Sequence, residues 1–188
     1  MRILAISGSL RRGSYNGALL EAAAAECPAD VEFVVWRGLA DLPAFDEDLE
    51  TAPEPLSVAT LKGEIARSDA VLISTPEYNA SVPGALKNAL DQSYKEWNRK
   101  PFTAIGYGGV GAARAIEHLR QIAIELQMVS THASVNIGGG DYMAVHPMFG
   151  KKPIEDIEAN LLPAAKTALD DLAWWARATM AARAAEAA

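Results

Sequence analysis

The chain has 188 residues, of which 50% are hydrophobic, so it can form one domain with a sizeable buried core. Its formal net charge of −7 disfavours a nucleic-acid partner, because proteins that bind nucleic acids concentrate Lys and Arg on one face, and the basic cluster Arg11-Arg12 is too short for that role. The single cysteine, Cys27, excludes an intramolecular disulfide and a thiolate metal cluster, and we expect it to pack at a helix end.

Apolar strands and helical stretches alternate along the chain. Five short, largely apolar segments are typical of strands buried on both faces of a sheet: Ile3–Ile6, Val31–Trp36, Ala70–Thr75, Phe102–Tyr107 and Thr131–Ile137. Helices are predicted from Ala18 onward, over Leu56–Arg67, Gly84–Trp97 and Ala112–Leu126, and from Pro153 or Ile154. Residues 138–152 are expected to form a long loop.

This alternation predicts the α/β class, with a parallel, doubly wound sheet, because parallel strands need crossover connections. We expect one domain over residues 1–188, in which the alanine-rich residues 177–188 extend the last helix or fray. Neighbouring positions on a helix point about 100° apart, so Trp174 and Trp175 cannot both face one core. One of them is expected at an edge or a subunit contact.

The segment from Gly8 to Gly17 follows the first strand, precedes the first helix and is rich in Gly and Ser. Such a turn gathers free backbone N–H groups, hydroxyl donors and the positive end of the helix dipole, which together favour an anion. Arg11 adds a charged group whose planar donors suit phosphate oxygens. The alternative is an ordinary turn in which Gly and Ser only permit the backbone angles.

The same segment narrows the kind of phosphate ligand. Ser14 and Tyr15 stand where the Walker A motif needs Lys and Ser or Thr, and the segment lacks the Gly-x-Gly-x-x-Gly spacing of dinucleotide sites. A single terminal phosphate fits better, surrounded by the side chains of Ser9, Arg11, Ser14 and Asn16. Flavin mononucleotide (FMN) at the first turn of a flavodoxin-like sheet is such a ligand.

Two further loops are expected at the same edge of the sheet. In a doubly wound sheet, ligands bind beyond the carboxyl ends of the strands, at the point where the strand order reverses. Residues 76–84 follow the third strand, and the glycine-rich residues 108–111 follow the fourth. A flat tricyclic ring can lie between these loops, because Gly permits close backbone approach. Taken alone, the glycine-rich segment is equally consistent with a helix entrance.

Two segments closely resemble those of the NADPH-dependent FMN reductases, a flavodoxin-like family that includes quinone, chromate and azo-dye reductases. They are Gly8–Asn16 and Thr75–Asp91, and the resemblance extends from the first strand to about Met128. It implies a three-layer sandwich with a five-stranded parallel sheet in the order 2-1-3-4-5, with bound FMN and with NADPH or NADH as co-substrate. It also implies a homodimer or a homotetramer.

The resemblance carries over to individual residues. Those expected at the phosphate are Ser9, Arg11, Ser14 and Asn16, and Tyr15 is expected to belong to the cofactor site as well. Those expected beside the flavin ring and ribityl chain are Pro76, Glu77, Tyr78 and Asn79, together with Tyr107, Gly108, Gly109 and Gly111 after the fourth strand.

The chain departs from the family pattern in two places. Relatives often have Ser where this chain has Tyr107, and many have a longer basic segment where it has residues 92–101. The surroundings of the ring's polar edge and the access of substrates are therefore left open.

The resemblance implies an oxidoreductase. We expect hydride to pass from the nicotinamide to bound FMN and then, in a ping-pong cycle, to a quinone, an azo compound, free flavin or an oxidised metal ion. No catalytic side chain is expected, because the chemistry takes place at flavin N5 while the protein aligns the rings. The acidic run Asp46–Glu50 is interpreted as a solvated loop.

The alternative function is a flavodoxin-like electron carrier that delivers single electrons to a protein partner. It has the same fold, but the turn around Arg11 and the segment Pro76–Asn79 resemble the reductases more closely. Reduction of the flavin by NADPH alone would distinguish the two functions.

Location and metal binding are predicted from what the sequence lacks. The apolar run near the N-terminus is too short for a signal peptide, and no run approaches the length of a membrane span. We therefore expect a cytoplasmic protein without membrane contact. His118, His132 and His146 share no ligand spacing, so no metal site is expected.

Overall fold

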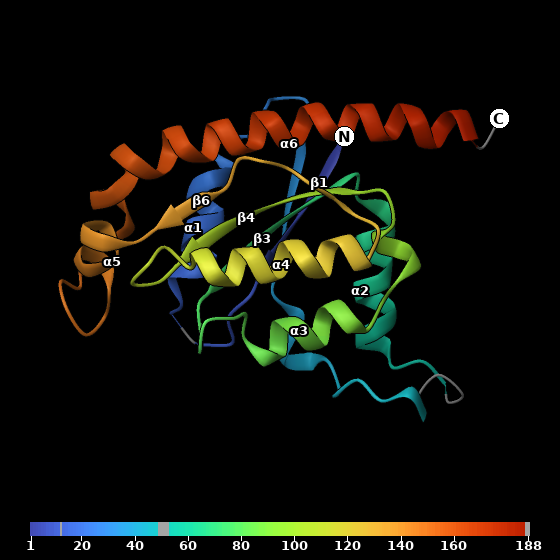
Figure 1. The fold of residues 1–188 in the computed structure, drawn as a ribbon, viewed down its shortest axis with the longest axis horizontal. Helices are drawn as coiled ribbons and strands as arrows, with labels where there is room; N and C mark the ends of the chain where they lie inside the picture. The colour runs from blue at the N-terminus through green and yellow to red at the C-terminus, as the bar shows by residue number, and fades with distance from the viewer. Residues whose placement is uncertain (12, 49–52, 187–188) are drawn as a thin grey trace.

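The computed structural model describes residues 1–11, 13–48 and 53–186. Arg12 of the basic cluster, Glu50 of the acidic run and the last two residues of the tail lie outside the described residues. The chain forms a parallel sheet with helices on both faces (Figure 1). Its strands run in the order β2-β1-β3-β4-β5, which confirms the flavodoxin-like order, and the short strand β6 also pairs with β4.

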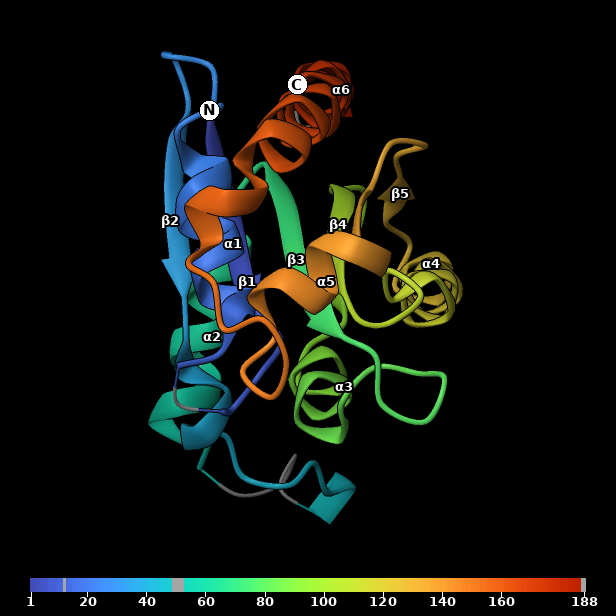
Figure 2. The same ribbon diagram turned by 90° about the vertical axis from the view of Figure 1, so that its left-hand side faces the viewer.

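Figure 2 shows the strands from β2 to β5 across the sheet in this order. The strands are β1 (Arg2–Ser7), β2 (Glu32–Trp36), β3 (Ala70–Pro76), β4 (Pro101–Tyr107), β5 (Val129–Ser130) and β6 (Val135–Ile137). The helices are α1 (Tyr15–Ala24), α2 (Leu56–Arg67), α3 (Gly84–Asp91), α4 (Ala113–Glu125), α5 (Gly139–Val145) and α6 (Glu158–Glu186). The described 3₁₀ turns include η1 (Gly38–Asp41), η3 (Lys95–Trp97) and η4 (Ile154–Ile157).

Alternation along the central strands divides the core between the two faces of the sheet. Leu4 and Ile6 of β1 pack with α2, α3 and α4, whereas Ile3 and Ala5 pack with α1 and α6. Successive side chains of a strand point to opposite faces, so both faces of β1 are apolar. Figure 1 shows α6 on one side of the sheet and α3 and α4 on the other. The same alternation places Tyr107, the last residue of β4, on the side of α1 and α6.

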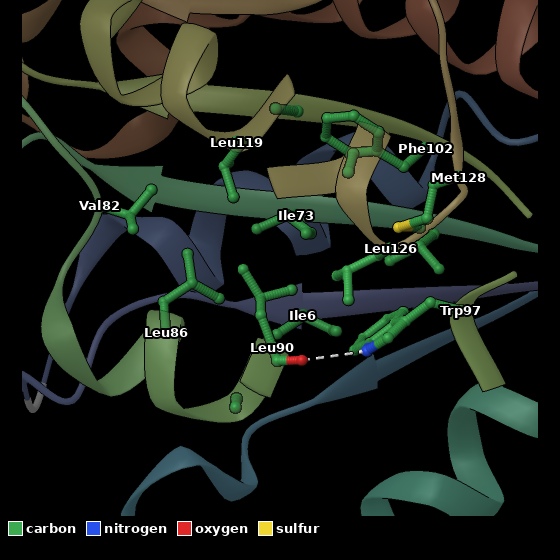
Figure 3. Packing of buried hydrophobic residues seen from close by; sticks show 14 of the residues in the cluster. Ile6, Ile73, Val82, Leu86, Leu90, Trp97, Phe102, Leu119, Leu126 and Met128 are labelled. Carbon is green, nitrogen blue, oxygen red and sulfur yellow. Dashed lines mark hydrogen bonds between the residues drawn. The ribbon is translucent and has the colours of Figure 1, made fainter. Parts of the chain in front are cut away.

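The helix after β3 is shorter than predicted. It ends at Asp91 instead of Trp97, and the chain continues through the separate turn η3. Ser93 Oγ donates a hydrogen bond to Glu96 Oε2 (2.6 Å), which favours a turn over a continued helix. Trp97 is fully buried, and its Nε1 donates to the carbonyl oxygen of Leu90 near the helix end (3.3 Å; Figure 3).

The predicted fifth strand, Thr131–Ile137, is wrong as one continuous strand. Two short strands, β5 and β6, pair with β4 on either side of residues 131–134. Between them Thr103 Oγ1 donates to the carbonyl oxygen of Ala133 (2.5 Å), and Thr131 Oγ1 donates to that of Phe102 (3.2 Å). Side-chain hydroxyls thus replace part of the backbone ladder, while the strand order is unchanged.

Residues 138–152 are not a plain loop, because they contain α5. Val145 of this helix is fully buried against the α1 and α6 side of the core, which explains why a glycine-rich segment becomes helical. The helix ends before His146, whose backbone is extended, since a residue that precedes proline disfavours the helical conformation.

The last helix begins as the turn η4 and continues as α6 to Glu186, so the described part of the tail extends the helix. Trp174 and Trp175 are 61% and 36% exposed, and their rings meet edge to face with centroids 5.0 Å apart. Both tryptophans therefore lie at the surface. Among the described residues, none of the helices has the length and apolar character needed to cross a membrane.

Candidate functional site

The turn between β1 and α1 brings backbone N–H groups to the carboxyl edge of the sheet. Gly8 N donates to the carbonyl oxygen of Ser74 in β3 (2.8 Å), and a Cβ on Gly8 would lie 2.4 Å from that oxygen. Ser14 caps α1, because its side-chain oxygen accepts from the backbone N of Asn16 (3.3 Å). Within α1, whose residues are all described, the first turn has no acidic residue, so its positive dipole end is uncompensated.

Arg11 and Asn16 have unused hydrogen-bonding groups at this turn. Arg11 is exposed, and its guanidinium forms no ion pair with any described residue. Asn16 is only 2% exposed; its Nδ2 donates to Ser14 Oγ (3.1 Å), whereas its Oδ1 has no partner in the described part of the chain. An unpaired guanidinium beside a helix N-terminus is suited to a phosphate group.

An ion pair joins the β3–α3 loop to the start of α4. The carboxylate of Glu77, whose side chain is 6% exposed, accepts hydrogen bonds from Arg114 Nε (2.7 Å) and from the backbone N of Arg114 (3.1 Å). Burial opposes ionisation of Glu77, but the hydrogen bonds and charge of Arg114 outweigh it, so the pKa of this carboxyl lies below its ordinary value. The pair holds the two loops at a fixed separation.

The β3–α3 loop reverses direction through a tight turn. Tyr78 and Ser81 form an antiparallel bridge with two backbone hydrogen bonds (2.9 and 3.0 Å). Between them, Asn79 and Ala80 have positive φ angles of 51° and 63°. Two consecutive left-handed residues are the signature of a type I′ turn, which Asn tolerates and Ala does not favour.

The three loops enclose a cavity of about 400 Å³ beyond the ends of β3 and β4. Ten of the predicted site residues line it: Ser9, Arg11, Ser14, Asn16, Pro76, Glu77, Tyr78, Tyr107, Gly108 and Gly109. Three do not: Tyr15 packs against Tyr107, Asn79 lies exposed at the tip of its turn, and Gly111 forms the backbone turn before α4 with φ +68°. Four lining residues were not predicted, namely Tyr142, His146, Pro147 and Met148.

A row of aromatic rings forms one side of the cavity. The centroid of the Tyr107 ring lies 5.6 Å from that of Tyr15 and 5.0 Å from that of Tyr142, and His146 stacks parallel to Tyr107 at 6.5 Å. Tyr107 is 6% exposed, and its hydroxyl has no hydrogen-bond partner in the described part of the chain. Its burial leaves a polar atom for which the protein itself supplies no partner.

The unpartnered atoms define what this cavity can bind. Asn16 Oδ1 and Tyr107 Oη are the two buried side-chain polar atoms without a partner among the described residues, and both residues line this cavity. Leaving such an atom unsatisfied costs about 1–3 kcal/mol, so a ligand that satisfies them is favoured. A ligand with a phosphate for Arg11, hydrogen-bonding groups for Asn16 and Tyr107 and a flat ring for the glycine-rich loop matches the lining. Over the described ranges, no cluster of His, Cys, Asp and Glu could hold a metal ion.

The comparisons with known proteins agree in the kind of protein they match. The model of the NADPH-dependent FMN reductase family matches residues 1–141. A quinone reductase of Escherichia coli strain K12 is 34% identical over 158 residues, which cover 80% of this chain and 84% of that protein. An NAD(P)H-dependent FMN reductase of Pseudomonas aeruginosa is 37% identical over 134 residues, which cover 68% of this chain and 72% of that protein.

A solved structure extends the similarity to the fold. FerB of Paracoccus denitrificans, a flavoenzyme NAD(P)H:(acceptor) oxidoreductase, is 30% identical to the chain and superposes with a TM-score of 0.75. The match covers 91% of this chain and 96% of FerB.

Proposed function

Because the chain belongs to the NADPH-dependent FMN reductase family, we propose that it transfers hydride from NADPH or NADH, by way of bound FMN, to a small electron acceptor. The chain is an oxidoreductase that uses FMN as its cofactor and NAD(P)H as its co-substrate. The observation that supports the proposed site most directly is the cavity lined by Arg11, Asn16 and Tyr107. Among the described residues, the Arg11 guanidinium has no ion-pair partner, and Asn16 Oδ1 and Tyr107 Oη have no hydrogen-bond partner. When bound there, FMN supplies the flavin N5 chemistry of hydride transfer.

In this proposal the phosphate of FMN is held by Ser9, Arg11, Ser14 and Asn16. Arg11 neutralises the negative charge and donates to the phosphate oxygens, while the N-terminus of α1 contributes its positive dipole end. Rotating the side-chain amide of Asn16 lets its Oδ1 accept from Ser14 Oγ and presents its Nδ2 to the ligand.

The flavin ring is assigned to the space between the β3–α3 loop and the glycine-rich loop after β4. Pro76, Glu77 and Tyr78 border this space on one side, and Gly108 and Gly109 border it on the other. The pair formed by Glu77 and Arg114 keeps the loops apart by a constant distance, so that a planar reactant can stack without further reorganisation of the protein.

The proposal also concerns which class of electron acceptor the enzyme reduces. Tyr78 and Val110 expose 52% and 58% of their surface on the two loops, which offers apolar contact to a planar nicotinamide or to a quinone. Quinones, azo compounds, free flavin and oxidised metal ions are all candidate acceptors, and the quinone reductase of E. coli makes quinones the first class to test. Both reactants would have to reach the same ring, so they bind in turn and the kinetics are ping-pong.

The proposal is tested on the purified protein loaded with its own pigment. Mass spectrometry of the pigment released by denaturation should identify FMN and not FAD. Anaerobic NADPH or NADH should then bleach the bound flavin in a stopped-flow experiment. Initial rates with varied nicotinamide and quinone concentrations should give parallel double-reciprocal lines, the pattern of a ping-pong cycle.

Two results would contradict the proposal. FAD in place of FMN would overturn the assignment of the phosphate turn. A protein whose flavin is reduced by dithionite but by neither nicotinamide would be an electron carrier, the alternative function with the same fold.

A further inference from the structure

Residues 139–152, which we call the cap, form a wall of the cavity. The cap consists of α5 and the turn that follows it, and its residues Tyr142, His146, Pro147 and Met148 line the cavity. Figure 2 shows α5 in front of the sheet near the end of β3. The cap follows β6, the last strand, and is far in sequence from the turn between β1 and α1. Both nevertheless line the same cavity.

Several contacts hold the cap in place. Tyr15 Oη, on α1, donates to the carbonyl oxygen of Lys152 (3.4 Å). Asn160 Nδ2, on α6, donates to the carboxylate of Asp141 (3.0 Å). Val145, at the end of α5, is fully buried and anchors the cap in the core. The wall is therefore built by the protein itself and can present polar groups at fixed positions.

Two such groups have no partner in the described protein. The first is Tyr107 Oη, and the second is Nε2 of His146. His146 Nδ1 accepts a hydrogen bond from the backbone N of Met148 (3.1 Å), so in the neutral ring the proton lies on Nε2. Both groups are thus available as hydrogen-bond donors to a ligand.

Tyr107 lies near the turn between β1 and α1, which we assign to the phosphate. Alternation along β4 places Tyr107 on the face of the sheet that α1 covers, and the Tyr107 ring contacts Tyr15 in the first turn of α1. Burial raises the pKa of Tyr107, Tyr142 and Tyr15 raise it further, and the nearby charge of Arg11 opposes them. The hydroxyl therefore stays protonated, and Tyr107 and Arg11 line the same cavity.

We propose that Tyr107 Oη and His146 Nε2 donate hydrogen bonds to the phosphate of FMN, so that the cap belongs to the phosphate site. The inference rests on the proposed function, because it takes FMN as the occupant of the cavity. It also changes the role of Tyr107, which the sequence placed beside the ring. With the cap included, two segments separated by more than a hundred residues discriminate FMN from riboflavin.

The experiment compares the affinities of FMN and riboflavin, measured by quenching of flavin fluorescence on apoprotein. Tyr107→Phe removes the hydroxyl alone. His146→Asn keeps an acceptor for the backbone N of Met148 and removes the donor, whereas His146→Gln keeps a donor near the position of Nε2 and loses that acceptor. Tyr94→Phe, which deletes an exposed hydroxyl remote from the cavity, is the matched control.

Tyr107→Phe and His146→Asn should each weaken FMN binding about tenfold, the effect of one hydrogen bond to a charged group, and leave riboflavin binding unchanged. His146→Gln and Tyr94→Phe should bind both flavins as the wild type does. The phosphorus NMR resonance of bound FMN should shift in the first two variants only. Thermal unfolding of the apoproteins checks that the variants fold. If a His146 variant does not fold, the affinities of Tyr107→Phe test the inference.

Equal losses for FMN and riboflavin, or no loss for either, would overturn the inference while leaving the proposed function intact. Failure of the proposed function looks different, because then the wild type itself binds no FMN or is not reduced by NADPH and NADH.

Discussion

Two of the cavities in the molecule differ in size and in the state of their polar groups. The larger, of about 770 Å³, lies among α2, α3, η3 and the end of α4, and two of its lysines are paired: Lys62 with Glu54 (2.5 Å) and Lys87 with Asp91 (2.7 Å). The smaller, of about 400 Å³, contains Arg11, which has no ion-pair partner among the described residues. Lysines that are already paired with carboxylates offer a ligand little electrostatic attraction.

The two cavities also differ in what forms their walls. Helices, turns and loops supply the lining of the larger one, whereas Pro76 and Tyr107 bring the ends of β3 and β4 into the smaller one. Both of the buried atoms that lack a partner among the described residues belong to the smaller cavity. Unmet hydrogen bonding at the carboxyl edge of the sheet, and not volume, is therefore the basis on which we propose the smaller cavity as the ligand site.

Removing one cation from each cavity should give the largest contrast. Arg11→Ala should weaken FMN binding by about 1.5–3 kcal/mol, which corresponds to a loss of tenfold or more, because a charge-assisted contact to phosphate is lost. Riboflavin, which lacks the phosphate, should bind almost as before. Lys62→Ala, in the larger cavity, should change neither affinity. Fluorescence titration measures all four values, and a matching loss of riboflavin binding would remove Arg11 from the phosphate site.

Breaking one ion pair beside each cavity compares how much the two pairs contribute to the free energy of unfolding. Arg114→Met leaves the carboxylate of Glu77 buried without its main partner, so the free energy of unfolding should fall by about 1–3 kcal/mol. Lys87→Met breaks a half-exposed pair with Asp91 and should cost less than about 0.5 kcal/mol. Urea unfolding of both apoproteins measures the difference. Equal losses of free energy of unfolding would contradict the prediction that the pair of Glu77 and Arg114 stabilises the fold more than the pair of Lys87 and Asp91.

The same pair predicts a dependence of stability on pH. The pKa of Glu77 is lowered in the folded protein, so its contribution is complete above the ordinary carboxyl pKa of 4.5 and is lost as the pH falls through the folded value. The stability advantage of the wild type over Glu77→Gln should therefore shrink as the pH is lowered below 4.5. Urea unfolding at a series of pH values tests this, and a constant difference would show that ionisation of Glu77 does not stabilise the fold.

The smallest expected effect concerns backbone strain in the loops beside the smaller cavity. Asn79, Ala80 and Ala112 in these loops have positive φ angles. Ala80→Gly should raise the free energy of unfolding by about 0.5–1 kcal/mol, because Gly adopts this conformation without steric cost. Asn79→Gly should change it less, since Asn tolerates left-handed angles. Thermal or urea unfolding measures both, and a loss of stability in Ala80→Gly would contradict the assigned strain.

Much of the fold could be predicted from the sequence because it depends on local patterns. Short apolar segments separated by helical stretches predict parallel strands, and β1 to β4 form within a residue or two of the expected bounds. The grouping of Ser9, Arg11, Ser14 and Asn16 at one cavity was also predictable, because these residues are neighbours in sequence, whereas their role at a phosphate stays a prediction. The oligomeric state stays a prediction, since one sequence does not reveal which exposed surface a second copy covers.

The tertiary structure decided the rest. The fifth strand divides because Thr103, on the neighbouring strand, bonds to the backbone of Ala133, a contact that no local pattern encodes. The cap becomes a wall of the site because burial of Val145 fixes a glycine-rich segment against α1 and α6, which brings His146 beside Tyr107. Hydrophobic burial depends on which distant surfaces meet, so such contacts follow from the packed fold and not from the order of residues along the chain.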